Sequence, residues 1–134
     1  MSSLLVKDVM AKHPPAISGG TSLNEVVETL LRHKLSGLPV INDQEQVVGF
    51  VSEQDCLRSI LVSSYHAEGD PKVEDVMHTE PLTVVLDGSV VDVAEQMVKQ
   101  KPKIYPVVDE RRRLVGLLMR SQVLTALKNN RSNS

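Results

Sequence analysis

The stretch GFVSEQDCL, residues 49–57, returns later in the chain as GLLMRSQVL, residues 116–124. Both copies begin with glycine and end with leucine. The first copy carries a hydroxyl at Ser52 and a carboxylate at Asp55, and the second copy has neither group at the matching positions. The repeat predicts two similar folding units. Only the first would keep a polar site built from a hydroxyl and a carboxylate.

The repeat extends over most of the chain at a constant offset. Residues 6–61 align with residues 73–128 without a gap, and about 14 of the aligned pairs are identical. Units of about 56 residues are close to the size below which a hydrophobic core rarely stands alone. We therefore expect two repeats, residues 1–66 and 67–134, packed as one intertwined, pseudo-symmetric module with a loop at about 62–72.

Composition places the chain among globular proteins and excludes several function classes. It has 134 residues, a hydrophobic fraction of 41% and a formal net charge of −2. This net charge does not indicate the positively charged surface that binds nucleic acid or an anionic membrane. The single cysteine, Cys56, cannot form an internal disulfide and is typical of a reducing compartment. Because no long apolar run and no signal-peptide pattern are present, we expect a soluble, cytoplasmic protein.

Local patterns predict the same order of elements in each repeat. Capping serines, Ser22 and Ser89, precede apolar residues at helical spacing. The runs LPVIN and YPVVD predict strands, and polar turns lead back through VVGFV and LVGLL. A second helix is expected near Ser52 and near Ser121, and a short helical turn at VKDVM and VEDVM. Each repeat is therefore helix–strand–helix–strand–strand–helix, an α+β fold.

The motif Ser52-Glu-Gln-Asp55 allows two interpretations at a strand-to-helix junction. As a capping box, it would satisfy backbone N–H groups at the start of the helix. As a nucleotide site, Ser52 would donate its hydroxyl to a phosphate at the helix N-terminus, and ionised Asp55 would accept from both hydroxyls of a ribose. The matching Met119 has no hydroxyl and Gln122 has no charge. The sequence therefore predicts one good polar site, with the second lost or altered.

The remaining reactive residues form no recognisable catalytic set. The four histidines, His13, His33, His66 and His78, lack metal-ligand spacing, and no P-loop or dinucleotide-binding glycine motif is present. Cys56 is expected to be a buried structural thiol, because its counterpart in the other repeat is an apolar valine. We therefore expect neither an enzyme nor a metal site.

Three segments occur in the same order in both repeats: VMAKHPPAI, LPVIND and VVGFVSEQD, then VMHTEPLTV, YPVVDE and LVGLLMRSQ. In this ordered set the chain resembles a tandem pair of CBS domains, often called a Bateman module, over nearly its whole length. The resemblance implies a non-catalytic regulatory module. It also implies a reversible adenosine ligand, such as AMP, ADP, ATP or S-adenosylmethionine, in a cleft between the repeats, no covalent cofactor, and a disc-shaped dimer.

The resemblance also assigns site residues. A Ser/Thr-x-x-Asp motif at this junction holds phosphate and ribose in the family, which carries over onto Ser52 and Asp55. The adenine would lie near positions of the other repeat, with Phe50 flanking the pocket; these positions are His78, Thr83, Lys103, Ile104, Tyr105 and Pro106. From the residues alone, Tyr105 and Phe50 are more often core and Lys103 a solvated side chain, so both interpretations stay open. The chain departs from the usual pattern at His78, where threonine is common, and at Ala11.

Two functions therefore compete. The first is an adenosine-sensing module that acts on an effector protein in trans, and it is favoured by Ser52 and Asp55. The second is a structural dimerisation module without a nucleotide, in which Asp55 only caps a helix, and it is favoured by the altered second motif. Self-association is expected in both, because the apolar helix faces of a small α+β unit need covering.

Overall fold

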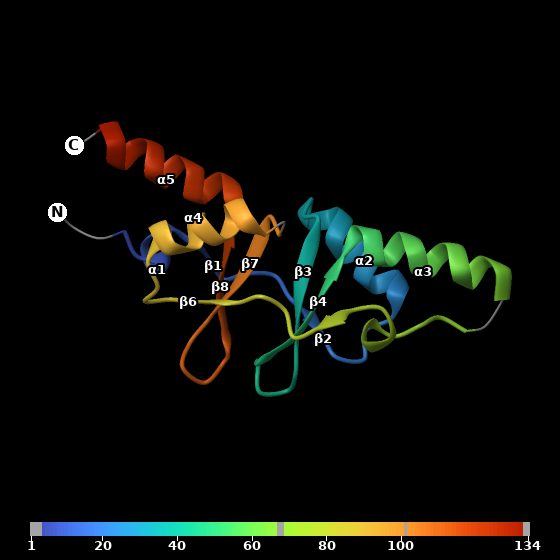
Figure 1. Ribbon diagram of the computed structural model, residues 1–134. Coiled ribbons are helices and arrows are strands. Elements are labelled where there is room, and N and C mark those ends of the chain that lie inside the picture. Colours follow the sequence, from blue (N-terminus) through green and yellow to red (C-terminus); the bar gives the residue numbers. More distant parts are fainter. Residues whose placement is uncertain (1–3, 67–68, 101, 133–134) are drawn as a thin grey trace. The chain divides into compact units, whose positions relative to one another are not determined.

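The computed structural model describes residues 4–66, 69–100 and 102–132 as an α+β protein (Figure 1). The first half of the chain contains α1 (Val6–Val9), β1 (Ala11–Lys12), β2 (Ile17–Ser18), α2 (Leu23–His33), β3 (Gly37–Ile41), β4 (Val47–Ser52) and α3 (Glu53–His66). The second half contains the 3-10 helix η1 (Val73–Asp75), β5 (His78–Thr79), β6 (Val84–Val85), α4 (Val90–Lys99), β7 (Ile104–Val108), β8 (Leu114–Met119) and α5 (Arg120–Ser132). This order confirms the predicted fold class.

Most element boundaries follow from local sequence signals. The side chain of Ser22 accepts the Glu25 N–H at the start of α2, and Ser89 does the same for Asp92 at the start of α4. The sequence pattern does not predict β1 and β5, because two residues are too few to show alternation. Helix α3 runs to His66, inside the predicted loop at about 62–72, and residues 67 and 68 lie outside the described residues. No helix within the described residues is long and apolar enough to cross a membrane.

The chain forms two compact units whose borders differ from those of the sequence repeats. The central unit is Pro15–Pro81, and the terminal unit combines Met1–Pro14 with Leu82–Ser134. Each has a four-stranded sheet, with the order β2-β3-β4-β5 in the central unit and β1-β8-β7-β6 in the terminal unit. The opening segment of each repeat therefore completes the sheet that the body of the other repeat builds. The repeat border between residues 66 and 67 stays a prediction about the sequence.

The opening segments of the two repeats, α1–β1 and η1–β5, are called the exchanged segments below. Equivalent hydrogen bonds hold both of them. In the central unit, the Val73 N–H donates to the Thr21 carbonyl at 2.8 Å. In the terminal unit, the Val6 N–H donates to the Gly88 carbonyl at 2.9 Å. The two bonds join matching positions of the repeat, so both segments dock in the same way.

A close approach of methionine to glycine also fixes each exchanged segment. A Cβ added at Gly49 would lie 2.5 Å from the Met77 sulfur and 2.9 Å from a backbone carbonyl oxygen of β5. A Cβ added at Gly116 would collide with the Met10 sulfur and lie 2.9 Å from a carbonyl oxygen of β1. Because close-packed interiors have no room for such an atom, β4 and β8 need glycine where the exchanged strands pair with them.

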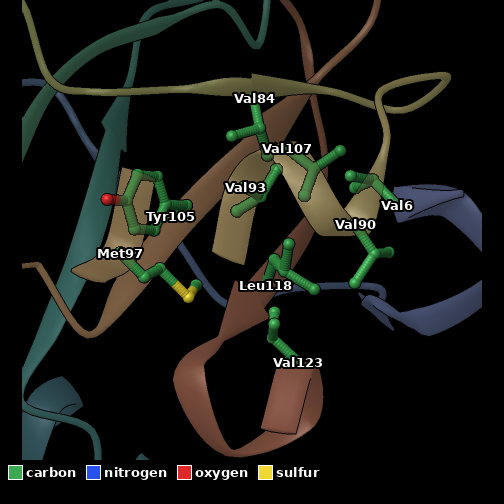
Figure 2. Close-up of a cluster of buried hydrophobic side chains, with 9 residues drawn as sticks. All are labelled: Val6, Val84, Val90, Val93, Met97, Tyr105, Val107, Leu118 and Val123. Atoms are coloured by element: carbon green, nitrogen blue, oxygen red, sulfur yellow. The ribbon is translucent and has the colours of Figure 1, made fainter. Parts of the chain in front are cut away.

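Each unit has its own hydrophobic core. In the central unit it consists of Ile17, Leu23, Val26, Leu30, Leu38, Val40, Val51, Cys56 and Val73. In the terminal unit it consists of Val6, Val84, Val90, Val93, Met97, Tyr105, Val107, Leu118 and Val123 (Figure 2). Aliphatic side chains dominate both cores, which agrees with a sequence that has one Phe, two Tyr and no Trp. Apolar burial of this kind is the main favourable term in folding.

Tyr105 is the polar exception in the terminal core. Its ring replaces Leu38 of the first repeat, and its hydroxyl points away from Val93 and Leu118 at the edge of the cluster (Figure 2). This hydroxyl is buried and has no hydrogen-bond partner among the described residues. Burial raises the pKa of the Tyr105 phenol above its usual value.

The glycine contacts generate a stability prediction. Gly49→Ala is expected to lower the free energy of unfolding by about 1–3 kcal/mol, because an added methyl group must displace the backbone of β5. Urea denaturation of the wild type and the variant measures this difference. Gly69→Ala is the matched control, because a Cβ at Gly69 meets no atom within 4 Å. Equal stabilities of the two variants would contradict the account.

Candidate functional site

A buried carboxylate marks the junction between β4 and α3. Asp55 lies in the first turn of α3 and is 4% exposed. Among the residues whose burial is described, it is the only charged residue in the buried class. A buried charge is stable only when hydrogen bonds and opposite charges replace its water. The partners of each carboxylate oxygen therefore show what the site can do.

One carboxylate oxygen of Asp55 belongs to a capping box with Ser52. The Ser52 N–H donates to Oδ2 at 3.0 Å, and the Ser52 hydroxyl donates to the same oxygen at 2.8 Å. In return, the Asp55 N–H donates to the Ser52 Oγ at 3.1 Å. These bonds confirm the capping-box interpretation of the motif, and they commit Oδ2 to the helix start.

The other carboxylate oxygen of Asp55 faces an imidazole and a guanidinium. Oδ1 lies 2.9 Å from Nε2 of His78 and 3.5 Å from Nη1 of Arg58. The side chains of His78 and Arg58 are 68% and 67% exposed, whereas that of Asp55 is 3% exposed. Oδ1 is therefore covered by groups that themselves face solvent.

Strand pairing brings His78 to this position. In the antiparallel pair of β4 and β5, His78 lies opposite Phe50. Residues opposite each other in such a pair project from the same face, and alternation along β4 puts Ser52 on that face too. The Phe50 ring packs against Gly37, where an added Cβ would collide with it. An aromatic ring, a hydroxyl and an imidazole thus share one face of the central sheet.

The matching junction of the terminal unit keeps the cap without the charge. Oε1 of Gln122 accepts the Met119 N–H at 2.8 Å. Asp55 accepts the Ser52 N–H in the same way. Gln122 therefore reproduces the hydrogen bond that caps the helix. A neutral amide oxygen is a weaker acceptor than a carboxylate. This outcome agrees with the expectation that the second motif is altered.

The two side chains that contact Oδ1 of Asp55 change together with the carboxylate. At the positions that match His78 and Arg58, the terminal unit has Ala11 and Thr125. The unit that lacks the carboxylate therefore also lacks both side chains that contact Asp55 in the central unit. Arg58 was not predicted as a site residue. The sequence could have indicated it, because Asp55, Arg58 and His78 all differ from their counterparts in the other repeat.

The other predicted site residues lie in the terminal unit. Thr83 is half-buried just before β6, and Lys103 is exposed just before β7. Ile104, Tyr105 and Pro106 are buried within β7. Tyr105 is a core residue, which was the alternative interpretation. The assignment of all five positions to a ligand stays a prediction.

Cys56 is a buried thiol, as expected. It is 3% exposed and packs in the core of the central unit. Burial, followed by the negative charges of Asp55 and Glu53, raises the pKa of the Cys56 thiol. This environment disfavours the reactive thiolate. Within the described residues, no group of three or more His, Cys, Asp or Glu side chains is placed to hold a metal ion.

Both repeats match the model of a known protein family. A model of the CBS domain matches the chain twice, at residues 6–62 and 73–129. The chain belongs to the CBS-domain family. The matches cover most of the sequence and coincide with the internal repeat, which confirms the resemblance to a tandem CBS pair.

Solved CBS-pair structures share the fold along almost their whole length. CBSX2, a CBS-pair protein from Arabidopsis thaliana, is 28% identical with a TM-score of 0.84, and 99% of this chain and 100% of that chain are covered. The structure of CBSX2 in complex with AMP is 30% identical with a TM-score of 0.82 over 95% and 98% of the two chains. The CBS domain pair of protein MJ0100, in complex with 5′-methylthioadenosine and S-adenosyl-L-methionine, is 25% identical with a TM-score of 0.80 over 96% and 99%.

A longer relative carries the name of an enzyme. L-aspartate semialdehyde sulfurtransferase of Methanocaldococcus jannaschii is 29% identical over 114 residues, which are 85% of this chain. The aligned part is 21% of that protein. The chain therefore spans about a fifth of this relative's length, and the enzyme's name describes the longer protein.

Proposed function

We propose that this CBS pair is a non-catalytic regulatory module that binds an adenosine-containing ligand through Asp55. The observation that carries the proposal is the buried carboxylate whose Oδ1 is covered only by exposed side chains. An ionised carboxylate is a strong acceptor for the two hydroxyls of a ribose. The complexes of CBSX2 with AMP and of MJ0100 with S-adenosyl-L-methionine support an adenosine-containing ligand.

The proposal assigns one main site to the chain. Ser52 would contribute its hydroxyl and Phe50 its ring, because both lie on the face of the central sheet that carries His78. Gln122 and Met119 would leave the other junction without a charged acceptor and without a hydroxyl. Regulation requires that the ligand bind two conformations with different affinities. The cytoplasmic location stays a prediction from the sequence.

The test is ligand affinity in a neutral variant of the carboxylate. AMP, ADP, ATP and S-adenosylmethionine are each titrated into the wild type and into Asp55→Asn by calorimetry. The variant keeps an acceptor for the cap, as Gln122 does, but loses the charge. Its affinity is expected to fall by about 10- to 150-fold, which corresponds to one hydrogen-bonding charged group.

Gln122→Ala is the matched control, since it changes the equivalent residue of the other repeat. Its affinity is expected to stay within about threefold of the wild type, a change of less than about 0.7 kcal/mol. Wild-type protein that binds none of the four ligands would refute the proposed function. An Asp55→Asn variant that binds as tightly as the wild type would remove Asp55 from the site.

We also propose that two copies associate through the helices. Apolar residues of α2 and α3 are exposed, with Leu31 at 65% and Leu57 at 60%. The matching residues of α4 and α5, Val98 and Leu124, are 88% and 69% exposed. An open groove of about 360 Å³ lies beside the first pair. Exposed apolar surface that recurs in both repeats is typical of an interface.

Sedimentation equilibrium over a dilution series tests this association. The wild type is expected to show twice the chain mass of 14.8 kDa. The double variant Leu57→Glu and Leu124→Glu is expected to show the single mass, because buried unpaired charges oppose association. Val85→Glu, an exposed apolar position on β6, is the control and should stay dimeric. A wild-type mass of one chain would refute the dimer.

A further inference from the structure

The exposed imidazole of His78 occupies the oxygen that the proposed ligand needs. Oδ2 of Asp55 accepts two hydrogen bonds from Ser52, one from its N–H and one from its hydroxyl. Oδ1 is the remaining oxygen, and Nε2 of His78 lies 2.9 Å from it. A carboxylate offers about four lone-pair positions in total. With Arg58 also at 3.5 Å, the structure leaves Asp55 no spare acceptor position for two further hydroxyls.

We propose that His78 competes with the ribose of the ligand for Oδ1 of Asp55, and thereby sets the affinity of the site. This inference rests on the proposed function, because it concerns the same carboxylate. When a ribose binds, its two hydroxyls take the positions at Oδ1 that the His78 imidazole and the more distant Arg58 guanidinium occupy, and His78 turns toward solvent. The start of α3 stays capped when the ligand binds, because Oδ2 keeps its bond from the Ser52 N–H.

The exposure of the two partners supports this role for His78. The carboxylate is fixed by its helix and by its cap, whereas the histidine side chain is 68% exposed and sits on a strand of only two residues. Of the two groups, His78 is therefore the one that is free to leave. Ion pairs between exposed side chains are worth about 0.2–1 kcal/mol, and the high exposure of His78 brings its contact with Asp55 toward that range. A contact of this strength lowers ligand affinity without preventing binding.

The comparison between repeats gives independent support. A histidine that served only the fold of the exchanged segment would be needed in both units, because β1 and β5 pair in the same way. The terminal unit has Ala11 at this position and still forms the strand pair. His78 therefore accompanies the carboxylate and is not required for strand pairing.

The experiment compares two ligands that differ only in the hydroxyls Asp55 would bind. AMP and 2′,3′-dideoxy-AMP are titrated by calorimetry into the wild type, His78→Ala and His33→Ala. Removing His78 is expected to tighten AMP binding about two- to fivefold, the equivalent of up to about 1 kcal/mol. Binding of the dideoxy nucleotide should be unchanged, because it cannot displace His78. His33→Ala, an exposed histidine at the end of α2, should change neither affinity.

Each alternative result overturns a defined part of the account. Unchanged or weaker AMP binding by His78→Ala would refute competition and leave the Asp55 site in place. Equal tightening of both nucleotides would show that His78 acts through something other than the ribose hydroxyls, which also refutes the inference. Wild-type protein without AMP affinity would refute the proposed function itself. His78→Thr, with a shorter side chain, serves the same comparison if the alanine variant does not fold.

Discussion

The contact on which both units depend is the approach of an exchanged backbone segment to a strand glycine. At Gly49 and Gly116 a side chain of any size would meet a carbonyl oxygen of β5 or β1 at about 2.9 Å. Without that approach each sheet would lose its fourth strand. In the central unit it would also lose His78, which β5 carries to Asp55. The glycine that recurs in the sequence is thus a condition for the site as well as for the fold.

The two junctions cap their helices in the same way but differ in charge. Both junctions satisfy the start of a helix, one with a carboxylate and the other with the neutral oxygen of Gln122. Folding therefore does not need a charge at this position. Burying the Asp55 charge carries a desolvation cost that the neutral amide of Gln122 avoids. Natural proteins accept such costs mainly at functional sites. The retained charge at Asp55 is therefore the reason to propose a function for this junction.

Sequence analysis predicted the features that depend on local chemistry. Capped helices, hairpins, the buried Cys56 and the box of Ser52 and Asp55 all follow from spacing over a few residues. The exchange of opening segments could not be predicted, because β1 and β5 are two residues long and their pairing joins distant parts of the chain. The contact of His78 with Asp55 depends on that exchange, so the family resemblance placed His78 near the adenine without indicating its contact with Asp55.

The central claim is that one of the two similar junctions, the one with Asp55, is the ligand site. The number of AMP molecules bound per chain at saturation tests it most directly, and calorimetry on protein of known active concentration measures that number. The account predicts one AMP per chain. Two equivalent AMP molecules per chain would contradict it, because the junction with Gln122 would then bind as well as the junction with Asp55.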